Sequence, residues 1–130
     1  MITAVHTLLY VEDVDAARAF LRDVLRLPYA DTGGGWLIFR SGPSEMGVHP
    51  ASWEHDGHSG ATDQRFDVSL MCDDLAATMA DLESRGAEFA GEVQDEQWGR
   101  TVSLKVPGAG TIMLFEPMYD PPATAGPAHS

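Results

Sequence analysis

Apolar residues follow the same order of patterns twice along the chain. Residues 4–11 read as a β-strand rich in branched and aromatic side chains, and residues 65–72 repeat that pattern in the second half. Each strand leads into a segment whose apolar residues recur at helical spacing, over 14–26 and again from 75 to a stop at Gly86. Asp13 and Asp74 stand at the two expected helix N-caps, 74 − 13 = 61 positions apart.

Three short strands are predicted after each helix. They cover 29–31, 36–39 and 45–49 in the first half, and 87–93, 101–106 and 111–115 in the second. A tandem unit too small to bury its own core must pack against its copy. The repeat therefore predicts an α+β fold in which two βαβββ modules, about 2–50 and 64–118, form one cupped mixed sheet. Residues 50–63 are expected to be an irregular link.

Composition narrows the classes of function. The 130 residues make one domain, expected over 1–118, and the Pro- and Ala-rich segment 119–130 is expected to be a flexible tail. With a net charge of −12 and only 8 basic residues, binding to nucleic acid or to an anionic membrane is not expected. A single cysteine, Cys72, and the lack of a long apolar segment predict a cytoplasmic protein.

Two motifs carry a resemblance to a known family. His-Thr-x-Leu-x-Val-x-Asp occupies residues 6–13, and Pro-Gly-x-Gly-x-x-x-Leu-Phe-Glu-Pro occupies residues 107–117. The chain resembles the vicinal oxygen chelate superfamily, which includes glyoxalase I, bleomycin-resistance proteins, fosfomycin-resistance enzymes and extradiol dioxygenases. The resemblance covers about 2–118 and implies the cupped two-module fold and a homodimer.

The resemblance also implies where a divalent metal would be bound. Enzymes of the family take their metal ligands from the first and last strands of each module. These positions fall on His6, Asp67, Leu114 and about Gly47, so two of the four ligands are missing. A bulge or a register one residue different would bring in Glu116 or His49. The expected metal set is His6, Asp67 and Glu116, an incomplete site.

Candidate residues for catalysis and ligand binding follow from the same arrangement. His6 and Asp67, at equivalent places in the two modules, are expected to face each other as an acid–base pair or as a structural hydrogen bond. Trp98, beside a turn, is the best candidate for stacking on a flat ligand. The other expected ligand-binding residues are His49, Met113, Leu114 and Glu116.

Two functions from different classes remain open, because one fold can serve many functions. The first is a glyoxalase- or bleomycin-resistance-like protein that binds an apolar or aromatic small molecule in the cup, with no cofactor. The alternative is a divalent-metal-dependent lyase, isomerase or dioxygenase acting on vicinal oxygens. Metal-free isomerase or lyase chemistry at His6 and Asp67 is a third hypothesis, so whether the protein is an enzyme stays open.

Overall fold

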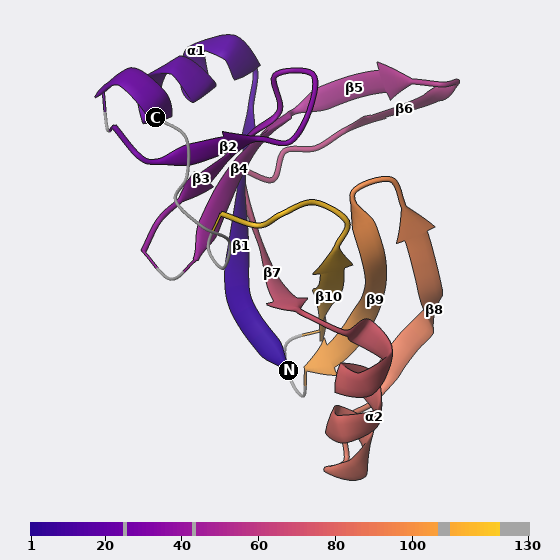
Figure 1. The fold of residues 1–130 in the computed structure, drawn as a ribbon. Helices are drawn as coiled ribbons and strands as arrows, with labels where there is room; N and C mark the ends of the chain where they lie inside the picture. The colour runs from indigo at the N-terminus through magenta and orange to yellow at the C-terminus, as the bar shows by residue number, and fades with distance from the viewer. Residues whose placement is uncertain (25, 43, 107–109, 123–130) are drawn as a thin grey trace. The chain divides into compact units, whose positions relative to one another are not determined.

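The computed structural model describes residues 1–24, 26–42, 44–106 and 110–122. Strands and helices follow one another twice in the same order (Figure 1). The elements are β1 (Ile2–Val11), α1 (Val14–Ala19), the π-helix η1 (Phe20–Val24), β2 (Tyr29–Asp31), β3 (Leu37–Arg40), β4 (Glu45–Pro50), β5 (Ser52–His55), β6 (His58–Ala61), β7 (Phe66–Cys72), α2 (Leu75–Ser84), β8 (Phe89–Glu96), β9 (Gly99–Val106) and β10 (Gly110–Pro117). Within the described residues, no helix is long and apolar enough to cross a membrane. Residues 123–130 of the expected tail lie outside the described residues.

The chain forms two compact units, and β1 contributes to each of them. Unit 1 comprises Met1–His6 and Val68–Asp120, and unit 2 comprises Thr7–Asp67 with 121–122 of the described residues. The first half of β1 therefore belongs with the second module, and only its second half belongs with the first.

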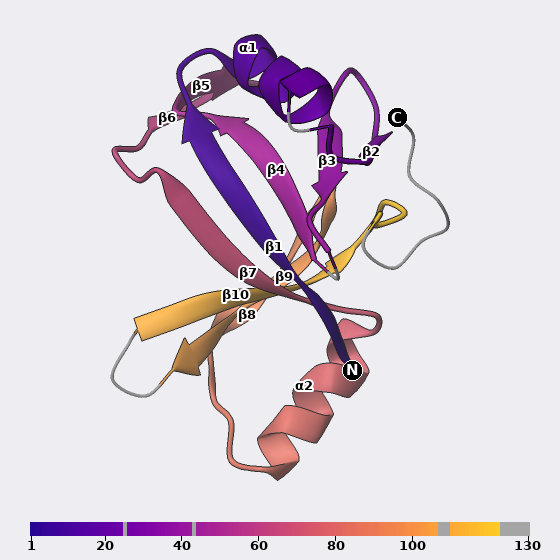
Figure 2. The same ribbon diagram turned by 90° about the vertical axis from the view of Figure 1, so that its left-hand side faces the viewer.

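Unit 2 is a small sheet with one helix-covered face. Its strands lie in the order β2-β3-β4-β1, with β2 and β4 each antiparallel to β3. α1 packs against β4 (Figure 2). The core on this face of the sheet contains four buried side chains, Leu21 of η1, Leu37 and Phe39 of β3, and Val48 of β4, and Val14 and Ala17 of α1 pack against it. Removal of these apolar surfaces from water is what holds the helix on the sheet.

Unit 1 repeats this plan. Its strands lie in the order β1-β7-β10-β9-β8, with β10 parallel to β7 and antiparallel to β9. The buried core on the α2 side contains Cys72, Leu75, Val102 and Leu114. In each module the first strand lies beside the last, β1 beside β4 and β7 beside β10, which confirms the predicted mixed α+β arrangement.

The two helices begin in the same way at the predicted residues. An Asp13 carboxylate oxygen accepts a hydrogen bond from the Ala16 N–H at 2.9 Å, and Asp74 accepts one from the Ala77 N–H at 3.0 Å. Each cap satisfies a backbone donor that has no partner inside its helix.

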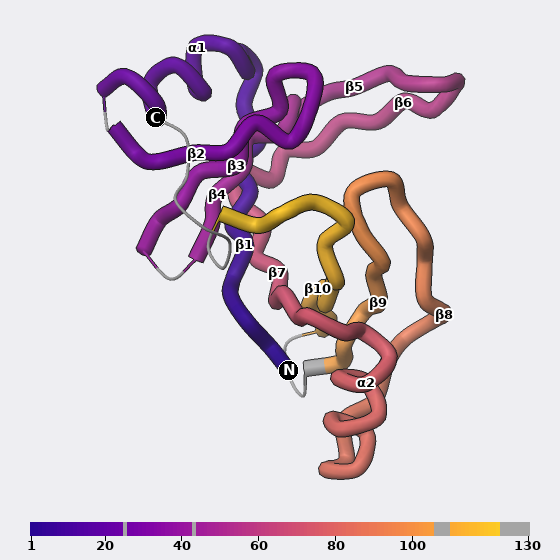
Figure 3. The backbone as a smooth tube through the Cα atoms, viewed as in Figure 1, coloured from indigo at the N-terminus to yellow at the C-terminus, as the bar shows by residue number. Residues whose placement is uncertain are grey.

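The prediction of an irregular link over residues 50–63 is wrong for most of this stretch. β5 and β6 form an antiparallel hairpin, which can be followed out and back along the tube in Figure 3. At its tip Asp56 and Gly57 have φ angles of +50° and +78°. Positive φ at both central residues is typical of a two-residue type I′ turn, for which Asp-Gly is a preferred sequence. The Asp-Gly pair in the sequence is therefore a signal that predicts the hairpin turn.

Candidate functional site

Three aromatic rings meet in unit 2 around the His49 imidazole. His49 lies 5.2 Å from Tyr10, 5.7 Å from Trp36 and 5.1 Å from Trp53 between ring centroids. The two tryptophan contacts are edge-to-face, with interplanar angles of 79° and 85°. This geometry is a favoured one for aromatic pairs. We name these four residues the His49 cluster.

Side chains point to alternate faces of the sheet along β4, and this explains why His49 can make these contacts. Val48 points into the core beneath α1, so its neighbour His49 points to the opposite face of the sheet. The same rule applies on β1, where Val11 packs against the core and Tyr10 points the other way. Two strands therefore place aromatic side chains on the sheet face that α1 leaves uncovered.

The β5–β6 hairpin supplies the third aromatic ring. Trp53 lies directly opposite Gly60 in the hairpin register. A Cβ atom at Gly60 would lie only 2.5 Å from the Trp53 indole, so the ring rests where only glycine leaves room. Trp53 keeps 37% of its surface exposed while it contacts His49. The hairpin thus presents a partly exposed indole at the edge of the cluster.

A hydrogen bond of the His49 ring and the Arg18 cation beside Trp36 hold the cluster in place. His49 Nδ1 lies 2.8 Å from the Pro50 carbonyl oxygen. The Arg18 guanidinium lies 4.7 Å from the centre of the Trp36 ring, and its Nη2 donates to the Val48 carbonyl at 3.0 Å. Burial lowers the pKa of Arg18, but the group remains a cation at neutral pH. Trp36 is therefore held by a cation–π contact with Arg18.

Asp67 adds a negative charge near Tyr10. Burial and the charge of Asp67 together raise the pKa of the Tyr10 hydroxyl. The hydroxyl therefore keeps its proton at neutral pH and can act as a hydrogen-bond donor. His6 belongs to unit 1 and Asp67 to unit 2. The predicted pairing of these two residues accordingly stays a prediction.

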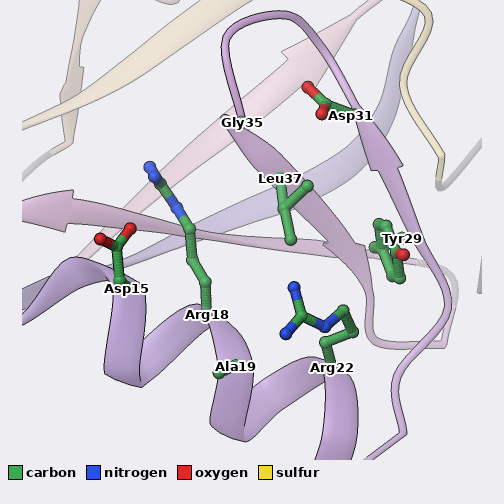
Figure 4. A pocket seen from close by; sticks show the side chains of 8 residues that line it. All are labelled: Asp15, Arg18, Ala19, Arg22, Tyr29, Asp31, Gly35 and Leu37. Carbon is green, nitrogen blue, oxygen red and sulfur yellow. The ribbon is translucent and has the colours of Figure 1, made fainter.

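A shallow pocket of about 550 Å³ lies on the other side of unit 2, between α1 and the β2–β3 turn (Figure 4). Arg18, Arg22, Asp15 and Asp31 all contribute to its lining. Arg22 is already paired with Asp23 at 2.8 Å. Charges of both signs give this pocket no preference for an anion or a cation.

Unit 1 carries a second row of aromatic side chains. His6 is 7% exposed and meets Phe115 edge-to-face, with ring centroids 5.6 Å apart. Phe115 also contacts Trp98 at 5.3 Å, and Trp98 is 44% exposed. The Tyr119 hydroxyl lies 3.5 Å from His6 Nδ1. Trp98 is therefore an exposed indole supported by buried neighbours.

Leu114 and Glu116 lie on the opposite face of β10 from this row, which corrects their expected grouping with His6 and Met113. Leu114 is fully buried in the α2 core, and Glu116 Oε1 accepts a hydrogen bond from the Leu75 N–H at 2.8 Å. Because side chains alternate along a strand, Met113 shares the face of Phe115 instead. Both corrected residues serve the attachment of α2.

Within the described parts of the chain, the side chains that could bind a metal ion do not gather around one point. No group of three or more His, Cys, Asp or Glu side chains there is placed to hold a metal ion. Glu116, expected as a ligand beside His6, uses its carboxylate at the N-terminus of α2. A metal centre normally needs at least three protein ligands around one point. Glu116 is therefore engaged away from the expected metal set, and a metal held by His6 and Asp67 stays a prediction.

Sequence reasoning missed three members of the His49 cluster. Tyr10 and Trp36 lie in predicted strands without an assigned role, and Trp53 lies in the expected irregular link. Tyr10 and Trp36 are next to core-facing residues and Trp53 is opposite a glycine, and these placements depend on strand register, which the sequence pattern did not resolve. The Asp-Gly turn was the one signal that could have placed Trp53 on a strand.

Comparison with solved structures shows proteins of the same fold. A methylmalonyl-CoA epimerase from Mycobacterium tuberculosis has a TM-score of 0.57 at 15% identity, covering 89% of this chain and 87% of its own. A structure described as an NAD-dependent benzaldehyde dehydrogenase from Legionella pneumophila has a TM-score of 0.56 at 12% identity, covering 87% and 98%. A hypothetical protein, BH1468, from Bacillus halodurans C-125 has a TM-score of 0.50 at 15% identity, covering 85% and 91%. At these identities the likeness concerns the fold alone.

The family comparison covers almost the whole chain. No curated protein matches the sequence. Residues 3–122, however, match the family described as the Glyoxalase/Bleomycin resistance protein/Dioxygenase superfamily. The order of strands and helices in each module agrees with that match. The chain is therefore a member of the Glyoxalase/Bleomycin resistance protein/Dioxygenase superfamily.

Proposed function

We propose that this protein binds a flat aromatic or apolar small molecule against the His49 cluster of unit 2. The observation that carries the proposal is the contact of one imidazole with three aromatic rings on the sheet face that α1 leaves uncovered. Ligand sites are commonly lined by aromatic and apolar side chains with a few fixed polar groups. The cluster has both, because the His49 imidazole carries polar nitrogens and packs against three aromatic rings.

Partial exposure supports the proposal over a purely structural role. Tyr10, Trp36 and His49 are each half buried, and Trp53 is more exposed still. Rings that served only as core would be removed from water more completely, as Phe39 is on the other face. The exposed parts of these rings leave surface against which a planar ligand can stack.

The test is a titration of the ¹⁵N-labelled protein with unlabelled indole, followed by NMR. The chain has three tryptophans, so three indole N–H signals report on three places. Trp36→Phe, Trp53→Phe and Trp98→Phe assign them. We expect saturable shifts of the Trp36 and Trp53 signals. Shifts confined to Trp98 would move the site to unit 1, and the absence of any saturable shift would refute ligand binding.

We further propose that binding needs no divalent metal. The support is that Glu116, one of the expected metal ligands, is hydrogen-bonded to the backbone of α2. Adding excess EDTA to the same titration should leave the apparent affinity unchanged. A loss of binding that Zn²⁺, Mn²⁺ or Ni²⁺ restores would favour the metal-dependent alternative.

A further inference from the structure

The hydrogen bond of His49 fixes which of its ring nitrogens carries the proton. Nδ1 lies 2.8 Å from the Pro50 carbonyl oxygen, and a carbonyl oxygen can only accept a hydrogen bond. Nδ1 must therefore be the N–H donor. In the neutral ring the other nitrogen, Nε2, then carries a lone pair and can only accept.

Nε2 has no hydrogen-bond partner among the described residues, although its ring is packed against three others. Among the described residues, neither the Trp36 N–H nor the Trp53 N–H donates a hydrogen bond to Nε2. Nε2 is not among the fully buried side-chain atoms that lack a partner, so a ligand that brings a donor can reach it. The rings packed around His49 lower the local dielectric, which strengthens such a bond.

We propose that His49 Nε2 is the polar recognition point of this site, and that the ligand is a planar aromatic molecule with an N–H or O–H donor on its edge. This inference rests on the proposed function and adds the class of ligand to it. The stacking rings hold the plane of the molecule, while the single acceptor orients its edge. The charge of Asp67, which acts on Tyr10 of the cluster, disfavours an anionic ligand.

The Arg18 cation contacts Trp36. Its guanidinium is 4.7 Å from the centre of the Trp36 ring and its Nη2 donates to the Val48 carbonyl at 3.0 Å, while its buried Nε has no hydrogen-bond partner among the described residues. The indole N–H groups of Trp36 and Trp53 are donors, but an aromatic ligand stacked on these rings meets their faces. The polar groups of the cluster therefore favour a neutral aromatic ligand that carries a hydrogen-bond donor.

The experiment compares indole with 1-methylindole, which has the same ring system but no N–H donor. Both are titrated into the ¹⁵N-labelled protein, and the affinity is taken from the Trp36 and Trp53 signals. We expect indole to bind about three- to tenfold more tightly, as one net hydrogen bond provides. The His49 Nε2 signal should move when indole is added but not when 1-methylindole is added.

A variant isolates the role of the imidazole nitrogen. His49→Phe keeps a ring for the three aromatic contacts and removes the acceptor, so indole should bind no better than 1-methylindole. His55→Phe, on the exposed hairpin, is the matched control and should keep the wild-type preference. If His49→Phe does not fold, the wild-type Nε2 signal still decides the question.

Each result separates this inference from the proposed function. Equal affinities for the two ligands in the wild type, or an Nε2 signal that indole does not move, would overturn the role of His49 while leaving aromatic binding in place. A preference for indole that persists in His49→Phe would assign the acceptor elsewhere. Failure of both ligands to bind would overturn the proposed function together with this inference.

Discussion

The replacement of Gly60 by alanine tests how Trp53 reaches His49. A Cβ atom at Gly60 would lie 2.5 Å from Cζ2 and 2.7 Å from Cε2 of the Trp53 indole. Carbon atoms in contact are separated by roughly 3.5 Å, so the indole must move by about 1 Å. The three atoms nearest to the new methyl group all belong to Trp53, so the indole is the group that must give way.

The expected cost follows from where the indole can go. Trp53 is 37% exposed and can swing toward solvent, so the variant is not an overpacked core. The loss is then mainly the edge-to-face contact with His49, worth about 0.5–1.5 kcal/mol. If the Trp53 indole could not move, Gly60→Ala would lower the free energy of unfolding by about 1–3 kcal/mol, as overpacking does. We therefore expect Gly60→Ala to lower the free energy of unfolding by about 1 kcal/mol.

The assay is urea unfolding of four proteins: wild type, Gly60→Ala, Trp53→Ala and the double variant. If the indole is the cause, Gly60→Ala should be nearly neutral once Trp53 is already alanine, and the cycle isolates their coupling. The indole titration should weaken in Gly60→Ala as well. The reasoning is refuted if Gly60→Ala destabilises the Trp53→Ala background as much as it does the wild type.

Three further predictions address α2, the core and Tyr10. Glu116→Ala should lower the free energy of unfolding by about 0.5–2 kcal/mol because the Leu75 N–H loses its acceptor, whereas Glu116→Gln keeps an oxygen and should lose less; equal losses in urea unfolding would contradict this. Leu114→Ala, in the fully buried core, should cost about 2–5 kcal/mol in the same assay, and a cost under about 1 kcal/mol would contradict its placement. Asp67→Asn should lower the raised pKa of Tyr10 toward its ordinary value, followed by absorbance at alkaline pH against Tyr10→Phe; an unchanged titration would refute the charge effect. Since the folded state holds this proton more tightly than the unfolded chain, its contribution to stability is present below the ordinary tyrosine pKa and is lost as pH rises through the raised one.

The sequence by itself determined the order of elements and the family. Alternating and helical patterns are local, and each is imposed by the need to bury one face of a strand or helix. The caps at Asp13 and Asp74 were readable for the same reason, because a cap bonds to the backbone only three residues away. Both modules could therefore be recognised without any knowledge of how they fold in space.

Tertiary structure alone decided which side chains share a face and what they contact. A shift of one residue along a strand moves a side chain to the other face, and the sequence pattern did not fix the register of β10 well enough to separate Met113 from Leu114. The His49 cluster gathers residues from β1, β4, β5 and the turn before β3, which lie far apart in the chain. Such a group depends on strand pairing and on the space left at Gly60, and neither is a property of any single stretch of sequence.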